Sequence, residues 1–420
     1  MKIAMLTNNY RPFVGGVPIS VERQAQELIQ QGNEVTVFAP RYEGQEEGET
    51  LERIVRYHTR KRRMDNGMVY PGLLLDEIQA AFRRENFDVI HVHHPMFVGP
   101  WALYLGRKYQ IPVIYTYHTR YEDYLHYLPW LRQRDNSPAF KKRILAYIRE
   151  KLVPGYMRWF TNQCDMVIAP SEGMKGRIRS EGTWTPIEVL PTGLKDEFFQ
   201  PDPKRSQKIR DQYLREGEFL FCTVSRLEKE KNLEFLFRGA AEIKKRCDQA
   251  FKVLVIGDGR EKEALQILAE NLGISQEIVF VGNVANEDVK NYLHAADLFL
   301  FASKSETQGI VLAEALAAGT PVVAVKATGV DDIVKDAQNG YRTSENIEEW
   351  SQKALLALKP GIREQMEARA RSTAEGYRAS EIARNEKNLY VQCILKKESE
   401  TRALRMLEEG WAYRERGSRI

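Results

Sequence analysis

The sequence has few cysteines, and their spacing excludes the usual cysteine-based scaffolds. Four cysteines occur in 420 residues, at positions 164, 222, 247 and 393, and no two of them form a Cys-x-x-Cys pair. Disulfide frameworks and structural zinc sites need cysteines in closely spaced sets. The chain is therefore expected to work in a reducing compartment, with neither disulfides nor a zinc site.

Long apolar runs are also missing. No stretch of 18 residues is both apolar and uncharged, which argues against a membrane-spanning helix. The apolar run at the N-terminus, in MKIAMLTNNYRP, is too short for a signal peptide. Together with the cysteine usage, these absences predict a cytoplasmic protein that at most associates peripherally with the inner face of the cell membrane.

Three functional signatures are absent as well. No Gly-x-Gly-x-x-Gly opens the first predicted helix, which disfavours a nicotinamide-dependent dehydrogenase. No Asp-x-Asp follows a predicted strand, so no metal site is expected, and the adjacent Asp331 and Asp332 are interpreted as loop or helix-cap contacts. The net charge of +4 is small, and no basic aromatic sheet face is evident, which disfavours nucleic-acid binding.

What is present is the composition of an ordinary globular protein, with 43% hydrophobic and 29% charged residues. A chain of 420 residues is too long to fold around one hydrophobic core, and its length suits two domains. The charge is uneven, because residues 1–196 carry a net +5 and the remainder a net −1. The first half is thus the better match for an anionic surface.

Short apolar strands alternate with helical stretches in two successive series. Strands are predicted at residues 3–8, 34–39, 88–92, 112–116, 165–169 and 187–190, and again at 220–225, 252–257, 278–282, 298–302 and 321–325. Such a pattern indicates parallel sheets covered by helices on both faces. We predict two doubly wound α/β domains, at residues 1–196 and 205–377, joined by a polar linker at 197–204. Helices at about 378–420 are expected to return to the first domain.

The most informative stretch is FLFASKSETQGIVLAEALAAGTPVVAV, at residues 299–325. A strand ends in a polar turn with Glu306, which leads through Gly309 into a helix that contains Glu314. Ile310 and Val311 then lie in the first turn, where backbone N–H groups lack intrahelical partners and attract anions. Two such carboxylates can accept hydrogen bonds from two sets of hydroxyls on one elongated ligand. From the spacing alone, a capping glutamate and a solvated glutamate explain them equally well.

Other candidate residues also follow predicted strands, where ligands bind in sheets of this kind. Gly15 and Gly16 allow close approach of backbone to an anion, although a simple turn explains them too. Arg226 and Lys231 precede a helix start and describe a diphosphate clamp, with a solvated charged turn as the alternative.

Two further candidates follow strands of the two series. Val284 comes just after residues 278–282, where backbone groups can contact a nucleobase edge. His118 follows residues 112–116, beside Thr119 and Arg120. A lone histidine is more often structural, but this position suits a polar contact to substrate.

Residues 225–234, taken with SETQGIVLAEALAAGTPVVA, resemble the donor-binding signature of the family 4 retaining glycosyltransferases of the GT-B fold. Glu306 and Glu314 match the Glu-x7-Glu pair, and Arg226 and Lys231 match the basic pair. The resemblance extends over nearly the whole chain, because it includes the Gly15-Gly16 loop, His118 and the Pro-Thr-Gly turn at 191–193.

The resemblance implies two Rossmann-like domains facing a deep cleft. It also implies transfer of a hexose from a nucleotide sugar, with UDP-glucose as the expected donor. It implies no metal or other cofactor. Glu314 would hold the ribose hydroxyls and Glu306 the hydroxyls of the donor sugar, and His118 would contact that sugar from the opposite domain. His118 and Glu306 are thereby the implied catalytic residues. The implied donor-contacting set is Gly15, Gly16, Arg226, Lys231, Val284, Glu306, Gly309, Ile310, Val311 and Glu314.

A narrower likeness concerns the acceptor. TYHTRYEDYLHYLP at residues 116–129, and Thr307-Gln308 in place of the Gly-Phe commoner in the wider family, resemble bacterial 1,2-diacylglycerol 3-glucosyltransferases. This likeness implies a diacylglycerol-type lipid acceptor. A family member with a soluble acceptor would show the same donor residues, and a non-catalytic lipid- or nucleotide-binding protein would have little use for the full charged set. The oligomeric state is not predicted.

Residues 139–160, AFKKRILAYIREKLVPGYMRWF, are predicted to form a basic amphipathic helix. Six cations stand against Glu150 alone, and the aromatic residues include Trp159; the cations are Lys141, Lys142, Arg143, Arg149, Lys151 and Arg158. Anionic lipid headgroups attract such a helix by about 1 kcal/mol per well-placed cation. The alternative is an ordinary helix whose apolar stripe packs on the sheet. A second basic run, RKRR at 60–63, is expected in a loop.

Overall fold

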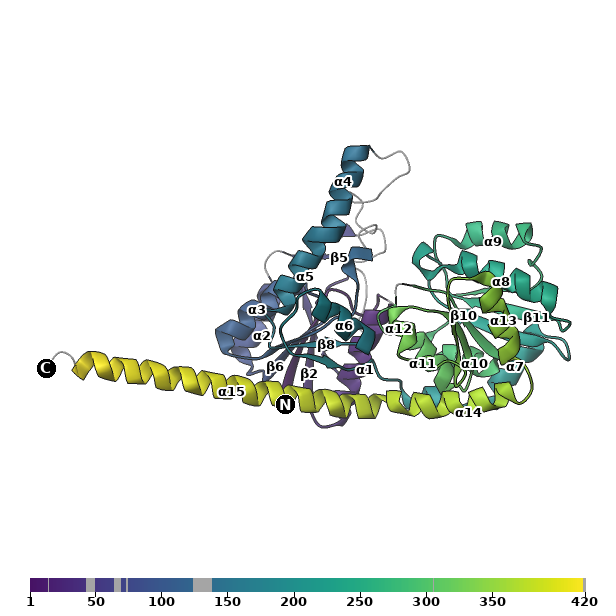
Figure 1. Cartoon of the computed structure of the whole chain (residues 1–420). Helices are drawn as coiled ribbons and strands as arrows, with labels where there is room; N and C mark the ends of the chain where they lie inside the picture. The colour runs from purple at the N-terminus through teal and green to yellow at the C-terminus, as the bar shows by residue number, and fades with distance from the viewer. Residues whose placement is uncertain are drawn as a thin grey trace. The chain divides into compact units, whose positions relative to one another are not determined.

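The computed structural model describes residues 1–13, 15–42, 50–63, 69–72, 75–123, 138–304 and 306–417 (Figure 1). The chain folds into two compact units. Unit 1 comprises Met1–Pro170, Lys175–Leu190 and Ile382–Ile420, and unit 2 comprises Ser171–Met174 and Pro191–Glu381. Residues 191–196, which the sequence suggested for the first domain, thus belong to unit 2.

Unit 1 is built on a seven-stranded parallel sheet in the order β3-β2-β1-β6-β7-β8-β9. Its strands are β1 (Lys2–Leu6), β2 (Glu34–Pro40), β3 (Arg53–Tyr57), β6 (Val89–Val92), β7 (Val113–Thr116), β8 (Met166–Ala169) and β9 (Ile187–Val189). Six of them match the predicted strands. β3 was not predicted, because its short sequence RIVRY contains two arginines and resembles a surface segment.

The helices of unit 1 follow its strands; they include α1 (Gly16–Gln30), α2 (Asp76–Arg84), α3 (Val98–Tyr109) and, from Lys175 on, α6 (Glu172–Ser180). α1 begins at Gly16, so Pro18 lies in its first turn. Proline is tolerated there because the N–H groups of a first turn have no intrahelical acceptor.

The basic run at 60–63 lies in a strand, so its assignment to a loop was wrong. β4 (Thr59–Arg63) pairs antiparallel with β5 (Val69–Pro71). A run of charge predicts contact with solvent, but it does not exclude a strand when a neighbouring segment satisfies the backbone hydrogen bonds.

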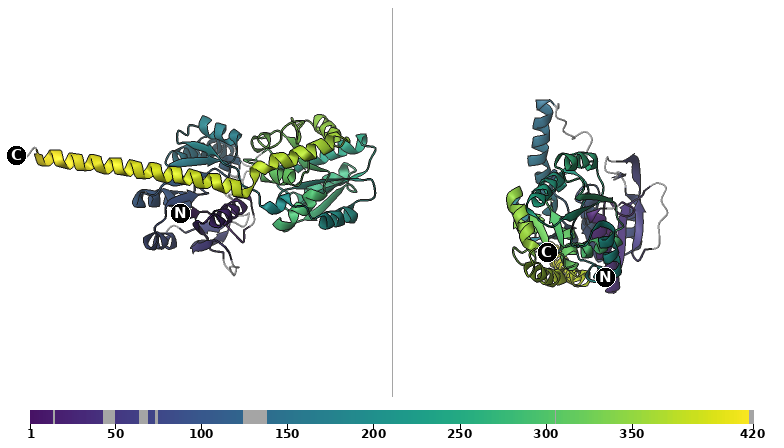
Figure 2. Two further views of the ribbon diagram at one scale, coloured as in Figure 1. Left: turned by 90° about the horizontal axis from the view of Figure 1, so that it is seen from below. Right: turned by 90° about the vertical axis from the view of Figure 1, so that its right-hand side faces the viewer.

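Residues 139–161 form one continuous helical segment made of α4 (Ala139–Tyr147), the π-helical turn η3 (Ile148–Leu152) and α5 (Val153–Thr161). Pro154 has no N–H to donate to the carbonyl four residues earlier, and the π turn accommodates that missing bond. In Figure 1 and in the right-hand view of Figure 2, α4 projects away from the rest of unit 1.

Unit 2 contains a six-stranded parallel sheet in the order β12-β11-β10-β13-β14-β15. The strands are β10 (Phe219–Val224), β11 (Phe251–Ile256), β12 (Ile278–Gly282), β13 (Leu298–Phe301), β14 (Val322–Val325) and β15 (Gly340–Thr343). Successive residues of β10, Leu220 and Phe221, enter two different hydrophobic cores. Both faces of the sheet are therefore covered by helices, which confirms the doubly wound prediction.

The helices of unit 2 are α7 (Pro203–Tyr213), α8 (Leu233–Arg246), α9 (Lys262–Asn271), α10 (Asn286–Ala295), α11 (Ile310–Ala317), α12 (Thr328–Asp331), α13 (Ile347–Ala357) and α14 (Ile362–Ala374). The predicted linker at 197–204 is instead part of this unit. Phe198, in the turn η4 (Asp196–Phe199), is fully buried in the core, so one aromatic anchor outweighs the polar composition around it.

The first part of the long helix α15 (Ala379–Gly417) lies along the rest of unit 1, and its C-terminal part extends beyond it (Figure 2). Ile382, Tyr390 and Cys393 are buried in the same core as the strands of its sheet, and Lys397 pairs with Asp165 at 2.9 Å. Within the described part of the chain, no helix combines the length and apolar character needed to cross a bilayer.

Candidate active site

The carboxyl ends of β10 and β13 bring together two of the predicted donor residues. Lys231 Nζ donates to Glu306 Oε1 at 2.5 Å, although the two residues are 75 positions apart. Their side chains are only 15% and 17% exposed. Ser303 Oγ donates to the same carboxylate oxygen at 3.1 Å. The neighbouring parallel strands therefore create the charged pair that the sequence could only suggest.

The surroundings of Glu306 keep it ionised. Burial is the largest single influence and raises its pKa, but the charge and hydrogen bond of Lys231 oppose it. With the Ser303 hydroxyl and the more distant Arg226, these interactions lower the pKa of Glu306 below its ordinary value. At neutral pH the group is a carboxylate, which is the form that accepts hydrogen bonds from sugar hydroxyls.

Arg226 lies at the outer side of the same strand end. Its side chain is 45% exposed and donates to Glu230 at 3.1 Å. The turn η5 (Lys229–Lys231) then leads to Asn232, whose left-handed backbone (φ 55°) starts α8. Asparagine tolerates this conformation better than most residues.

The two glycines of the Gly257-Asp258-Gly259 turn pack closely against the backbone on either side of Arg226. A Cβ at Gly257 would lie 2.0 Å from the carbonyl oxygen of Ser225, and one at Gly259 would lie 2.3 Å from that of Leu227. Only glycine fits at these two positions. The tertiary structure decides this close packing between the turn and the backbone around Arg226.

Gly309 adopts a left-handed backbone (φ 77°, ψ 48°) and precedes α11, as glycine permits. Ile310 and Val311 form the first turn of α11, and Glu314 lies one turn inside it with 6% exposure. A carboxylate so deeply buried is not a solvated helix residue, so that alternative is excluded for Glu314. Val284, just after β12, is half-buried and packs against the core of unit 2.

The remaining predicted residues belong to unit 1. Gly15 stands in extended conformation before α1, and Gly16 opens the helix with open space where a Cβ would lie. His118 follows β7, and its Nε2 shares a hydrogen bond of 2.9 Å with His93 Nδ1. Their roles in binding or catalysis stay predictions.

Sequence reasoning missed the buried chain of rings behind His118. The His93 ring lies 4.2 Å from that of His91, and His91 in turn contacts Tyr390 of α15 and Thr116, each at 2.6 Å. Burial, followed by the charges of neighbouring histidines, lowers the pKa of His93 and His118 well below the ordinary value. Both rings are therefore neutral at physiological pH. The signal in the sequence was HVHH at 91–94, in which alternate histidines of β6 share one face.

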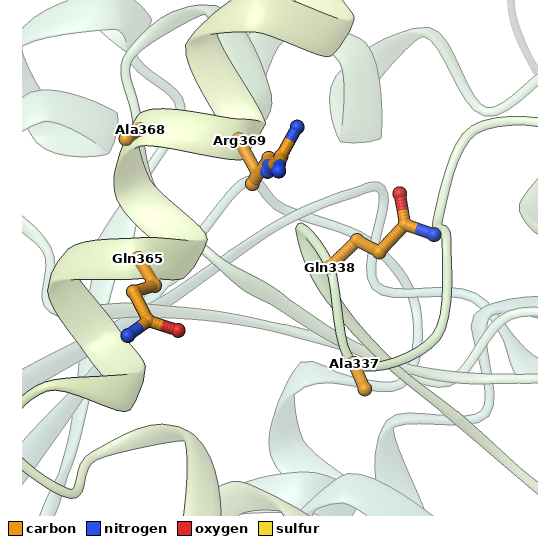
Figure 3. Close-up of a pocket in the computed structure, with 5 residues that line it drawn as sticks. All are labelled: Ala337, Gln338, Gln365, Ala368 and Arg369. Atoms are coloured by element: carbon orange, nitrogen blue, oxygen red, sulfur yellow. The ribbon is translucent and has the colours of Figure 1, made fainter.

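The two adjacent aspartates make the loop and cap contacts expected of them. Asp331 pairs with Arg342 at 3.4 Å, and Asp332 accepts from the N–H of Gly173 at the start of α6. The hollow of about 600 Å³ shown in Figure 3 lies elsewhere in unit 2 and contains none of the predicted site residues; it is lined by Ala337, Gln338, Gln365, Ala368 and Arg369.

The Lys231–Glu306 pair predicts a pH-dependent effect of Lys231→Met. A glutamate titrates near pH 4.3 in the unfolded chain. Because the pKa of Glu306 is lower in the folded protein, its ionised form adds to the free energy of unfolding above that pH. This contribution is lost as the pH falls through the pKa of the folded state. Methionine removes the opposing charge and raises the pKa of Glu306. Urea unfolding should show a larger destabilisation at pH 7 than at pH 3.5. Arg238→Met, which breaks the exposed pair with Glu234, should show no such pH difference.

Comparison with known proteins agrees with this arrangement. Residues 205–374 match the family "Glycosyl transferases group 1", and residues 14–198 match "Glycosyltransferase Family 4". An alpha-monoglucosyldiacylglycerol synthase of Streptococcus pneumoniae is 31% identical over 352 residues, covering 81% of this chain and 74% of that protein. A protein of the same name from Acholeplasma laidlawii is 28% identical over 410 residues, covering 94% and 98%.

The fold has solved counterparts. The structure of sucrose-phosphate synthase from Thermosynechococcus elongatus matches with a TM-score of 0.75 at 18% identity, covering 94% of this chain and 99% of that one. Identity at that level supports the fold alone, which is GT-B. Taken with the two family matches and the relative at 31% identity, it shows that this chain belongs to the group 1, family 4 glycosyltransferases.

Proposed function

We propose that this chain transfers glucose from UDP-glucose to a diacylglycerol-type lipid at an anionic membrane surface, with retention at the anomeric carbon. The observation that carries the proposal is the exposed apolar and basic surface of α4, η3 and α5. The relative at 31% identity supports it, because it is named as a synthase of alpha-monoglucosyldiacylglycerol.

The donor half of the reaction needs positive charge near the departing diphosphate. Arg226 and Lys231 supply two cations at one strand end, and the first turn of α11 adds backbone N–H groups. As the bond between the sugar C1 and the phosphate oxygen breaks, the acceptor hydroxyl oxygen bonds to C1 on the same face. Its proton passes to the released phosphate oxygen. Glu306 orients the sugar, and no metal ion takes part in the proposed step.

The acceptor half depends on the segment that projects from unit 1. Four of its apolar side chains are exposed, namely Phe140 (74%), Ile144 (41%), Tyr147 (63%) and Leu152 (56%), and Trp159 is 48% exposed. Leu145 is buried, so only part of the stripe packs inward as an ordinary helix would require. Large exposed apolar groups among cations favour an interfacial helix over a soluble one.

The first test is turnover of UDP-glucose with vesicles of diacylglycerol and phosphatidylglycerol, followed by UDP release and product chromatography. A glucosylated lipid is the expected product. UDP release without a lipid product would favour a soluble acceptor. Vesicle binding without turnover of UDP-glucose or other nucleotide sugars would favour the non-catalytic alternative.

The membrane role predicts the effect of neutralising three cations of α4. Changing Lys141, Lys142 and Arg143 together to glutamine should weaken binding to anionic vesicles about 100-fold, since each cation contributes about 1 kcal/mol. The chain contains a matched control, because residues 244–246 repeat the same Lys-Lys-Arg order on α8 of unit 2. The corresponding change there should leave vesicle sedimentation unaltered. Equal loss in both variants would contradict a membrane role for α4.

A further inference from the structure

The side chain of Gln308 is bound to the backbone of a distant turn. The N–H of Thr192 donates to Gln308 Oε1 at 2.7 Å, and Gln308 Nε2 donates to the carbonyl of Thr192 at 3.0 Å. Both residues are almost fully buried, with exposures of 5% and 3%. The amide thus pairs with Thr192 as a peptide group of a neighbouring strand would.

The two preceding residues are held as well, each by a different segment. The carbonyl of Thr307 accepts from Ser171 Oγ at 2.7 Å, and the carbonyl of Glu306 accepts from the N–H of Gly329 at 3.2 Å. A Cβ at Gly329 would lie 2.7 Å from the backbone of Gln308, so α12 packs directly against this loop.

We infer that Gln308 is a positioning residue for the donor site, an inference that rests on the function proposed above. Its side chain is committed to Thr192 and acts through the loop backbone. On one side of Gln308, that backbone positions the Glu306 carboxylate. On the other side it leads through Gly309 into the first turn of α11. Displacement of the loop would move both groups together relative to the donor, and a shift of about 1 Å at such a site can cost on the order of 100-fold in rate.

The paired hydrogen bonds with Thr192 use both polar atoms of the amide side chain at position 308. An apolar side chain could fill the same volume, but it would remove the two hydrogen bonds that Gln308 makes with the buried N–H and carbonyl of Thr192. Each such loss costs about 1–3 kcal/mol. The turn at 191–193 and the donor loop, which contains Glu306 and Gln308, are therefore joined by the hydrogen bonds of the Gln308 side chain.

The test compares two buried amides of unit 2. Asn339 is fully buried, accepts from the N–H of Lys335 and donates to the carbonyl of Ile333, and contacts no residue of the donor loop in these interactions. Gln308→Met and Asn339→Leu should both lower the melting temperature. Only Gln308→Met should raise the KM for UDP-glucose and the Kd for UDP, by about 10-fold or more, with the KM for the lipid unchanged.

The outcomes separate the inference from the function on which it rests. Normal constants for UDP and UDP-glucose in Gln308→Met, or an equal kinetic loss in Asn339→Leu, would overturn the positioning role while the wild-type chain stays active. A wild-type chain that neither binds UDP nor uses UDP-glucose would overturn both the inference and the proposed function.

Discussion

Glu306→Gln is expected to lower kcat/KM for UDP-glucose by about 100- to 1,000-fold, the loss typical of removing one preorganised electrostatic group. Glutamine keeps the shape of the side chain but not its negative charge, so Lys231 loses its counter-ion and the sugar loses a carboxylate acceptor. The measurement is steady-state release of UDP in the presence of the acceptor lipid. Glutamine is a better test than alanine, because alanine would also open a cavity beside a largely buried lysine.

Glu234→Gln is the matched control for this change. Glu234 lies on α8, is 65% exposed and pairs with Arg238 on the surface of the same helix. It should leave kcat/KM unaltered. Activity of Glu306→Gln within a few fold of wild type, with an unchanged melting temperature, would disprove the donor-site assignment.

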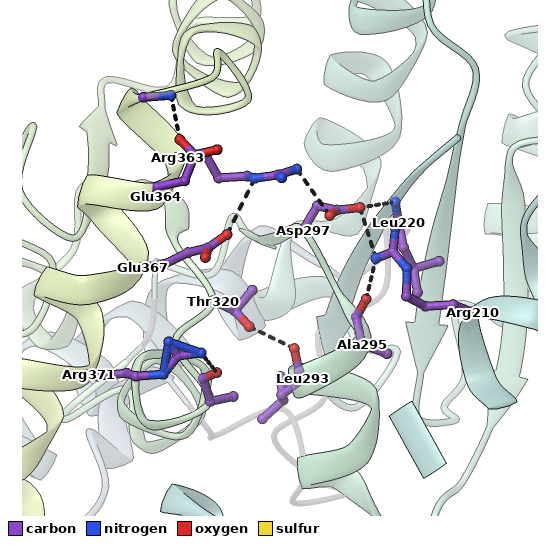
Figure 4. A network of polar contacts seen from close by, with 12 residues as sticks. Arg210, Leu220, Leu293, Ala295, Asp297, Thr320, Arg363, Glu364, Glu367 and Arg371 are labelled. Carbon is purple, nitrogen blue, oxygen red and sulfur yellow. Dashed lines mark hydrogen bonds and ion pairs between the residues drawn. The ribbon is translucent and has the colours of Figure 1, made fainter. Parts of the chain in front are cut away.

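Asp297→Ala should produce the largest loss of stability, about 2–4 kcal/mol in the free energy of unfolding. Asp297 is 12% exposed and accepts from the N–H of Leu220 at 2.8 Å. Arg210 of α7 and Arg363 of α14 also donate to it, at 3.1 and 3.2 Å (Figure 4). Alanine would leave two partly buried guanidinium groups and one backbone N–H without this acceptor. Urea denaturation at pH 7 measures the effect.

Asp248→Ala, at an exposed position of the same unit, should change the free energy of unfolding by less than about 0.5 kcal/mol. Below its melting transition, the Asp297→Ala variant should keep the wild-type KM for UDP-glucose. A loss of donor affinity as large as the loss of stability would show that the two ends of β13 are not independent.

The contrast between Asp297 and Glu306 follows from one strand. Asp297 immediately precedes β13 and Glu306 comes after it, so the strand itself, about 13 Å long, lies between them. In a parallel sheet the carboxyl ends of all strands lie on the same side of the sheet, and the amino ends lie on the opposite side. Residues at the opposite edge can therefore bind helices to the sheet without entering the donor site.

Most strands and the doubly wound class could be predicted from the sequence. Apolar runs bounded by glycine or polar turns are local patterns that can be recognised without knowledge of the tertiary contacts. The errors occurred where the local pattern is weak. β3 and β4 are charged, β15 (GYRT) has a single large apolar residue, and the predicted linker conceals Phe198. In each case the partner strand or the core, and not the local sequence, stabilises the element.

For the site, the sequence predicted residue types and their place after strands, but not their partners. It contained no signal that Lys231 would bind Glu306, that His93 would bind His118, or that Gln308 would pair with Thr192. These pairs are separated by 25 to 116 positions, and only strand order and loop packing decide which distant groups meet.

The sequence by itself determined the parallel α/β class and the basic character of residues 139–160. These properties depend on hydrophobic periodicity, glycine positions and charge, which are local. The tertiary structure decided that Glu306 is a paired carboxylate, that Glu314 is buried and that Phe140 and Tyr147 are exposed. Burial and electrostatic environment are properties of the whole fold, because every neighbour that removes water or adds charge comes from elsewhere in the chain.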